Sequence, residues 1–187
     1  MTRLSAVRRE DLSADTRQIL EALPDLRWFG VIARAESVLP SWLMMGGWIL
    51  TGLSISPQVR ELVILQVAAT AGCRYERAQH EAIARGVGVP DDQIAAVSNQ
   101  RLDADCITDP RGMLESINRL VQTHSLTPGE YATLSSAFDE RQLVEVLIVV
   151  GWYLAIALLA GAVDLDVDAA ADMAVVDAAN AHLGSTS

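Results

Sequence analysis

The sequence is poor in the residues that mark several common classes of protein. It has two cysteines, Cys73 and Cys106, and neither a Cys-x-x-Cys pair nor a Cys/His set with metal-ligand spacing. We therefore expect no metal site. Its 14 basic residues form no run, and the formal net charge is −10 with a pI near 4.6. Nucleic-acid affinity depends on clustered Lys and Arg, so this composition argues against a nucleic-acid partner.

The chain also lacks an evident targeting segment and an internal linker. Its first residues, MTRLSAVRREDLSADTRQIL, contain no apolar core of the signal-peptide type, so we expect a cytoplasmic protein with reduced thiols. No Gly/Ser-rich or Pro-rich stretch divides the 187 residues, which favours a single domain over residues 1–187. Hydrophobic residues make up 51% of the sequence, enough to build a buried core.

One apolar run raises the question of a membrane. Residues 146–163, VLIVVGWYLAIALLAGAV, carry no charge and are long enough for a transmembrane candidate. However, Glu145 lies at the edge of the run, the acidic segment DLDVD follows it, and no Arg cluster marks a cytoplasmic end. We therefore expect a central core helix and no membrane partner.

Periodicity and capping residues predict an all-α fold. Helices are expected at residues 13–23, 39–53, 56–72, 74–86, 91–99, 110–123, 127–137, 139–163 and 166–183. The helix of residues 56–72 has the clearest ends, because Ser56 is an N-cap, Pro57 occupies the first helical position and Gly72 ends the helix. Its apolar residues fall largely on one stripe. No run of alternating strand residues competes with the helices.

Four chemically active side chains lie around the boundary between two of these helices. Cys73, Glu76 and His80 are separated by three and four positions, which places them on one helical face. Glu61 lies near the start of the preceding helix. The sequence leaves open whether the 11-residue rise carries Glu61 about 16 Å away or the second helix packs back so that Glu61 meets His80. Only the second arrangement makes a site.

Each of these side chains suits a chemical role. A cysteine at a helix N-terminus has its thiolate stabilised by unpaired N–H groups, which lowers its pKa, although Glu76 opposes this for Cys73. His80 can transfer protons near neutral pH, and a carboxylate partner would orient its ring and raise its pKa. A partly buried Glu61 or Glu76 could itself act as general base or acid.

The stretch RELVILQVAATAGCRYERAQHEAIARGVGVPDDQIAAV resembles the carboxymuconolactone decarboxylase family of the alkylhydroperoxidase D-like superfamily. The resemblance covers about residues 30–168. It implies an alkylhydroperoxidase D-like helical bundle and a homo-oligomer, a trimer or hexamer whose subunits bury apolar helices together. Such an interface would also account for the apolar run of residues 146–163.

The peroxidase branch of this superfamily has a defined spacing: Glu, eleven residues, Cys, two residues, Cys, three residues, His. Glu61, Cys73 and His80 match the first, second and last positions, but Glu76 stands in the third. The resemblance implies that the missing cysteine is the one that attacks peroxide. Cys106 is too distant in sequence to replace it, so we do not expect a disulfide-cycling hydroperoxidase.

The segment CRYERAQH instead resembles the Tyr-Glu-x-x-x-His form of members without the cysteine pair. This form implies acid–base chemistry on a small carboxylated or lactone substrate, with no cofactor. His80 would be the general acid and Glu61 its orienting partner. Glu76 would be a second base or would repel a departing carboxylate.

The expected substrate pocket combines charge with aromatic residues. Two glutamates repel an anionic substrate, and the neighbouring arginines Arg60, Arg74 and Arg77 could compensate. Aromatic walls could come from Trp28, Trp42, Tyr75, Trp152 and Tyr153, of which Tyr75, Trp152 and Tyr153 are the predicted substrate-binding residues. Two alternatives stay open: a one-cysteine peroxidase that uses Cys73 and an external thiol, and a non-catalytic member of the fold.

Overall fold

The computed structural model describes residues 2–5, 7–106, 112–170 and 172–184. Over these residues the chain contains helices and no strand, which confirms the predicted all-α class. A short 3-10 helix at Arg9–Asp11 precedes α1 (Ala14–Glu21), α2 (Arg27–Ile32), α3 (Leu39–Thr51), α4 (Pro57–Thr70), α5 (Arg74–Gly86), α6 (Asp91–Ser98), α7 (Met113–Thr123), α8 (Pro128–Ala137), α9 (Glu140–Ala162) and α10 (Ala174–Gly184).

The capping residues set most helix ends where the sequence predicts them. The Ser56 side chain accepts a hydrogen bond from the Val59 N–H at the start of α4, and Asp139 forms a capping box with Gln142 at the start of α9. The sequence missed α2, a helix of six residues that has no side-chain cap. The first residues of the helix predicted at 110–123 lie outside the described residues, and α7 begins at Met113.

The last helix begins later than predicted. A helix was expected from residue 166, but α10 starts at Ala174. The intervening aspartates bind other parts of the chain: the Asp166 carboxylate accepts hydrogen bonds from the Thr2 N–H and hydroxyl, both at 3.0 Å. The Asp168 carboxylate accepts from the Arg27 N–H at 2.7 Å and from the Tyr75 hydroxyl at 3.0 Å. These tertiary hydrogen bonds hold the segment outside a helix.

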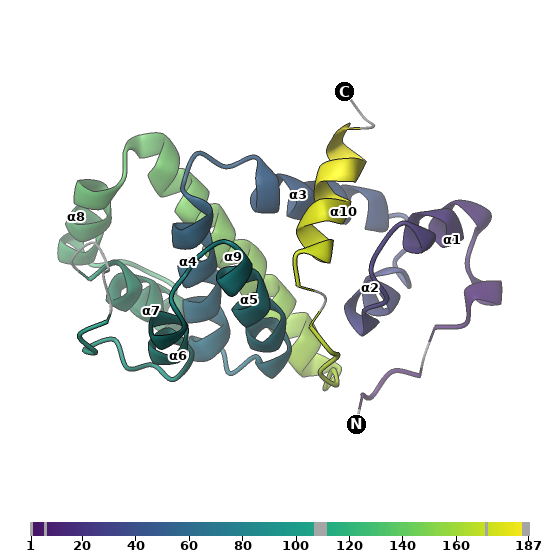
Figure 1. Cartoon of the computed structure of the whole chain (residues 1–187), viewed down its shortest axis with the longest axis horizontal. Helices are drawn as coiled ribbons and strands as arrows, with labels where there is room; N and C mark the ends of the chain where they lie inside the picture. The colour runs from purple at the N-terminus through teal and green to yellow at the C-terminus, as the bar shows by residue number, and fades with distance from the viewer. Residues whose placement is uncertain (1, 6, 107–111, 171, 185–187) are drawn as a thin grey trace.

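Helix α4 lies at the centre of the molecule and packs against α5, α6, α7 and α9 (Figure 1). All residues from Arg60 to Ala68 are buried, so the predicted single apolar stripe was too narrow. Burial on every side encloses Arg60, Glu61 and Gln66 together with the apolar residues. A polar group in such a place needs a partner within the fold.

Among the described helices, α9 is the one that is long and apolar enough to span a membrane. Half of its most apolar window is buried inside the molecule, against α4, α5, α7 and α8. This agrees with the predicted core helix. Its outer face exposes Val144, Ile148, Leu158 and Leu159. The oligomer that would cover this face stays a prediction.

Helix α10 returns from the C-terminal part of the chain and packs along α3, with α1 and α2 at the same end of the molecule (Figure 1). The linker before α10 is fixed by Asp168 and by Met173, whose sulfur lies where a side chain at Gly86 would stand. Segments far apart in the sequence thus meet beside α3. Between them and α5 lies a cavity.

Candidate active site

A tight turn brings α5 back along α4. Gly72 joins the two helices with φ +67°, a backbone conformation that favours glycine, and Cys73 is the N-cap of α5. His80 therefore meets Glu61, and the distance from His80 Nδ1 to Glu61 Oε2 is 2.7 Å. Of the two arrangements that the sequence leaves open, the structure has the one that makes a site.

Glu61 is completely buried and both of its oxygens are bound. Arg60 Nε donates to Glu61 Oε1 at 2.8 Å, and the same guanidinium donates to the Leu50 carbonyl. Beside the Arg60 guanidinium, Glu61 is a carboxylate, and a carboxylate can only accept hydrogen bonds. We therefore assign the hydrogen of the contact with His80 to its Nδ1. This leaves His80 Nε2 on the opposite side of the ring.

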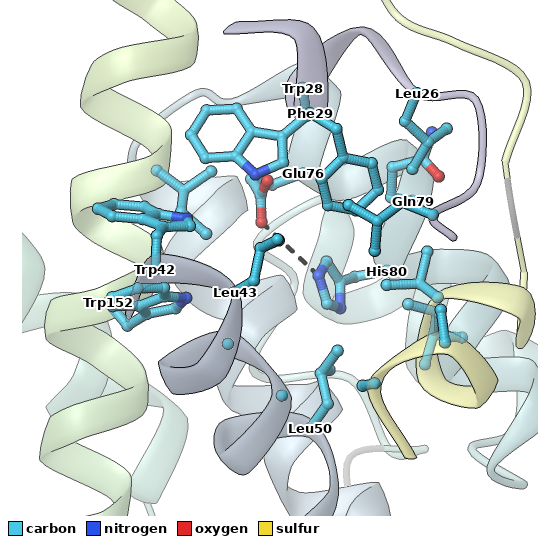
Figure 2. Close-up of a pocket in the computed structure, with 18 of the residues that line it drawn as sticks. Leu26, Trp28, Phe29, Trp42, Leu43, Leu50, Glu76, Gln79, His80 and Trp152 are labelled. Atoms are coloured by element: carbon cyan, nitrogen blue, oxygen red, sulfur yellow. Dashed lines mark ion pairs between the residues drawn. The ribbon is translucent and has the colours of Figure 1, made fainter. Parts of the chain in front are cut away.

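His80 Nε2 faces Glu76. Its distance to Glu76 Oε2 is 3.6 Å, longer than a hydrogen bond (Figure 2). Burial alone lowers the pKa of His80, but the Glu61 carboxylate and, less strongly, Glu76 outweigh burial and raise it above its usual value. The imidazole thus readily holds a proton that it can give up at Nε2.

Glu76 is a buried carboxyl group with little to stabilise its charge. Its residue is 5% exposed, and its Oε2 has no hydrogen-bond partner among the described residues. Burial raises the pKa of Glu76 to about 7, with His80 acting in the opposite direction and Glu61 adding to the rise. Near neutral pH the group therefore exchanges between acid and carboxylate, as a general acid or base does.

Cys73 is a poor candidate for a reactive thiol. Its residue is 8% exposed, and burial raises the pKa of the thiol. The Glu76 and Tyr75 N–H groups at the start of α5 act in the opposite direction, while the Glu76 carboxylate adds to the rise. The expected lowering at the helix N-terminus is thus outweighed by burial. The second free cysteine, Cys106, contacts the Asp92 carbonyl at 3.5 Å and does not line the cavity.

The cavity between α1, α2, α3, α5, α9 and α10 has a volume of about 300 Å³. Glu76 and His80 line it, and Figure 2 shows both among apolar side chains. The other lining residues are Ile19, Ala22, Leu23, Leu26, Trp28, Phe29, Trp42, Leu43, Gly46, Gly47, Leu50, Tyr75, Gln79, Ile83, Trp152, Tyr153, Ile156, Val175, Ala178, Ala179 and Ala181. A small apolar cavity with a few convergent polar groups is typical of a ligand site.

All five aromatic residues that the sequence proposed as walls line this cavity. The Trp42 and Trp152 rings lie 4.2 Å apart at 34°, and Trp28 lies 6.0 Å from Trp42 (Figure 2). The edge of the Tyr153 ring meets His80, with ring centres 4.8 Å apart. The Tyr75 hydroxyl points to Asp168 and is thus bound within the fold.

Sequence reasoning missed the walls that α1, α2 and α10 supply. Leu26 and Phe29 come from the segment around α2, and Val175, Ala178, Ala179 and Ala181 come from α10. These are ordinary apolar residues with no chemical motif. Their part in the cavity follows from long-range packing that no local pattern reports.

The arginines do not compensate the glutamates as the sequence suggested. Arg60 turns away to Glu61 and the Leu50 carbonyl, Arg74 is exposed, and Arg77 is a half-exposed surface residue 3.8 Å from Glu81. No Arg or Lys stands among the described residues that line the cavity. Likewise, no group of three or more His, Cys, Asp or Glu in the described part of the chain is arranged to hold a metal ion.

The part of the chain that holds this site is similar to a known family. Residues 42–108, which include Glu61, Cys73, Glu76 and His80, match the model of the carboxymuconolactone decarboxylase family. No curated protein matches the chain.

Two solved structures share the fold. The alkylhydroperoxidase AhpD core of an uncharacterized peroxidase-related protein from Ralstonia eutropha JMP134 is 18% identical, with a TM-score of 0.75, over 89% of this chain and 92% of the other. An uncharacterized peroxidase-related protein from Silicibacter sp. TM1040 is also 18% identical, with a TM-score of 0.76, over 90% and 92%. Residues 42–108 are thus similar to the carboxymuconolactone decarboxylase family, and the chain has the helical fold of these two structures.

Proposed function

We propose that the protein is an acid–base enzyme that moves a proton at a carbon atom next to a carbonyl group of a small lactone or related metabolite. The observation that carries this proposal is the buried Glu61–His80 hydrogen bond of 2.7 Å, whose imidazole presents Nε2 to the cavity beside Glu76. Glu61 fixes the tautomer of His80 and stabilises its protonated form.

The proton-transfer step balances without a further reactant. An enolate or dienolate form of the substrate carries an electron pair and a negative charge over carbon and oxygen. The His80 imidazolium gives its Nε2 proton to the carbon, the C–H bond forms, the carbonyl is restored and neutral His80 remains. In the reverse direction His80 takes the proton from carbon, and the Glu76 hydroxyl group stabilises the negative oxygen. Lactone isomerisation uses both steps, because His80 removes a proton from one carbon and returns it to another. Decarboxylation of a carboxymuconolactone-type compound uses only the protonation step.

The peroxidase alternative has less support from this chain. Two structural neighbours are named peroxidase-related, but at 18% identity they share the fold alone. Here the position of the second cysteine is Glu76, and burial raises the pKa of the remaining Cys73 thiol. A buried thiol with a raised pKa holds little thiolate at neutral pH, and the thiolate is the nucleophile.

The test uses two lactones and two matched histidine variants. Wild type, His80→Ala and His124→Asn are incubated in D2O with α-angelica lactone and with γ-carboxymuconolactone, and NMR follows deuterium entry, isomerisation and loss of the carboxyl group. His124 is exposed and lies outside the cavity, so its variant is the control. We expect the wild-type rate to fall at least about 100-fold in His80→Ala and not in His124→Asn. Full activity in His80→Ala, or no turnover of either lactone, contradicts the proposal.

A further inference from the structure

The cavity has a polar atom that the fold leaves for a ligand. Glu76 Oε2 is buried without a hydrogen-bond partner among the described residues, and His80 Nε2 is 3.6 Å away. Buried polar atoms are paired in most folded proteins because an unmade hydrogen bond is costly. Figure 2 shows this carboxyl group among the side chains that line the cavity. A ligand in the cavity can therefore supply the missing partner.

The walls favour a flat apolar molecule. Trp42 and Trp152 stack on each other, Trp28 stands next to them, and Phe29 and Leu43 complete this side of the cavity (Figure 2). Indole rings offer broad apolar faces that bind other flat rings by stacking. The volume of about 300 Å³ equals that of roughly ten water molecules, which sets the ligand at one or two small rings.

The charges of the site disfavour an anion. A carboxylate in the cavity would lie near Glu76 and Glu61, and no Arg or Lys stands among the described lining residues to pair with it. The His80 imidazolium is already held by Glu61 at 2.7 Å and also faces Glu76. The nearest guanidinium, that of Arg60, is bound to Glu61 and to a main-chain carbonyl. An unpaired charge in a buried site is strongly disfavoured.

We propose, resting on the acid–base function above, that the substrate is an uncharged, flat and largely apolar molecule with a carbonyl oxygen that accepts a hydrogen bond from the Glu76 carboxyl group. This narrows the substrate from a carboxylated or lactone metabolite to a lactone or ketone without a free carboxylate. The oxygen that Glu76 holds is the one that gains negative charge when His80 removes a proton from the adjacent carbon.

The protonation of Glu76 follows from the groups that face it. His80 and Tyr75 lie on the same helix and Cys73 is its N-cap, Glu61 lies on α4, and Tyr153 lies on α9. Burial raises the pKa of Glu76 to about 7, so the neutral, hydrogen-donating form predominates below that pH. Binding of an uncharged acceptor should weaken as the pH rises through this range.

The experiment measures binding and leaves turnover aside. Calorimetry compares coumarin, an uncharged bicyclic lactone, with coumarin-3-carboxylate, its anionic counterpart, at about pH 6 and pH 8. We expect coumarin to bind wild type about tenfold more weakly at pH 8 than at pH 6, and coumarin-3-carboxylate to bind at least tenfold more weakly than coumarin at both. Glu76→Gln keeps an N–H donor and should bind coumarin with the same affinity at both pH values.

Two tryptophan variants control for the walls. Trp42→Ala should weaken coumarin binding, whereas Trp48→Ala should not, because Trp48 is 54% exposed and outside the cavity. Equal or tighter binding of the carboxylate, binding of coumarin that ignores pH in wild type, or no coumarin binding at millimolar concentration overturns the substrate class. If coumarin binds as expected while His80→Ala keeps full activity, the acid–base function fails and the ligand class stands.

Discussion

Glu76 and Glu145 are two buried glutamates that the same fold treats in opposite ways. Their residues are 5% and 7% exposed. The Glu145 carboxylate accepts hydrogen bonds from the Ser54 N–H and hydroxyl, both at 2.7 Å, from the Ile55 N–H at 3.1 Å and from Arg141 Nε at 3.0 Å. Glu76 Oε2 has no such partner among the described residues.

The electrostatic consequences differ in sign. Burial raises the pKa of Glu145, but its hydrogen bonds outweigh burial and leave the pKa lowered. Burial raises the pKa of Glu76 to about 7. The Glu145 carboxylate, which has hydrogen-bond donors, holds α9 to the segment after α3. The Glu76 carboxyl group has no donor at Oε2, so it destabilises the fold and is suited to proton transfer. The hydrogen-bond partners of Glu145 and the deeper burial of Glu76 together separate the structural glutamate from the functional one.

The largest expected effect on stability is the loss of the Glu145 contacts. Glu145→Ala leaves the buried Ile55 N–H without its acceptor, so we expect the free energy of unfolding at pH 7 to fall by about 3 kcal/mol. Arg141→Ala removes a partner whose side chain is 72% exposed and should cost less than about 1 kcal/mol. Urea unfolding of both variants measures the difference, and equal losses would mean that the main-chain donors contribute nothing.

The Glu145 contribution has a definite pH dependence. Because its folded pKa is lowered, its stabilisation is complete above the unfolded pKa and is lost as the pH falls through the folded pKa. The difference between wild type and Glu145→Ala should therefore shrink in acid.

Glu76→Gln should stabilise the protein. The folded pKa is raised from 4.5 to about 7, so wild type loses stability as the pH rises from 4.5 through 7. Glutamine carries no charge at any pH and does not have this loss. We expect its free energy of unfolding to exceed that of wild type by on the order of 2 to 3 kcal/mol at pH 8 and by almost nothing at pH 4. Urea unfolding at the two pH values tests this, with Glu145→Gln as the matched variant that should lose stability. A Glu76→Gln protein no more stable than wild type at pH 8 would contradict the assignment.

His80 should change stability with pH in the same direction as Glu76 and in the opposite direction to Glu145. Because its folded pKa is raised, the stability that it contributes is complete below the unfolded pKa and is lost as the pH rises through the folded pKa. In the His80→Ala variant this loss is absent, but Glu76 loses its cationic neighbour, so the pKa of Glu76 should rise further and the stability loss that belongs to Glu76 should continue to higher pH than in wild type. An unchanged pKa of Glu76 in His80→Ala, read from the side-chain carboxyl ¹³C resonance, would argue against coupling between His80 and Glu76.

The smallest expected effect concerns the thiols. Cys73→Ser should change peroxide consumption by less than about twofold, since the buried thiol holds little thiolate. In wild type, Ellman's reagent should modify the half-buried Cys106 faster than Cys73. Rapid modification of Cys73 together with lost peroxide consumption in Cys73→Ser would favour the peroxidase alternative.

The sequence predicts the helices well where caps and glycines mark their ends, as at Ser56 and Gly72. It also brings Cys73, Glu76 and His80 onto one face, because helical spacing is local. It does not decide whether Glu61 reaches His80, since that depends on how α5 packs on α4. The expected helix from residue 166 fails for a related reason: Asp166 and Asp168 bind Thr2, Arg27 and Tyr75 instead of continuing a helix.

The protonation state of Glu76 is the property least visible in the sequence. RYERAQHEAIAR has the composition of a solvated helix, but the cavity that its carboxyl group lines has walls from α1, α2, α3, α9 and α10. Among the described residues, these distant segments place no Arg or Lys in the wall of the cavity. Both the raised pKa and the preference for an uncharged ligand therefore arise from tertiary packing.

One measurement tests the contrast between the two glutamates directly. In protein labelled with ¹³C at the glutamate side-chain carboxyl carbons, with Glu76→Gln and Glu145→Gln used for assignment, NMR follows each resonance between about pH 3 and pH 9. We expect Glu76 to titrate near pH 7 and Glu145 below its usual value of 4.5. Titration of Glu76 at or below 4.5 would show a permanently ionised carboxylate and would contradict its role as the proton-bearing group of the cavity.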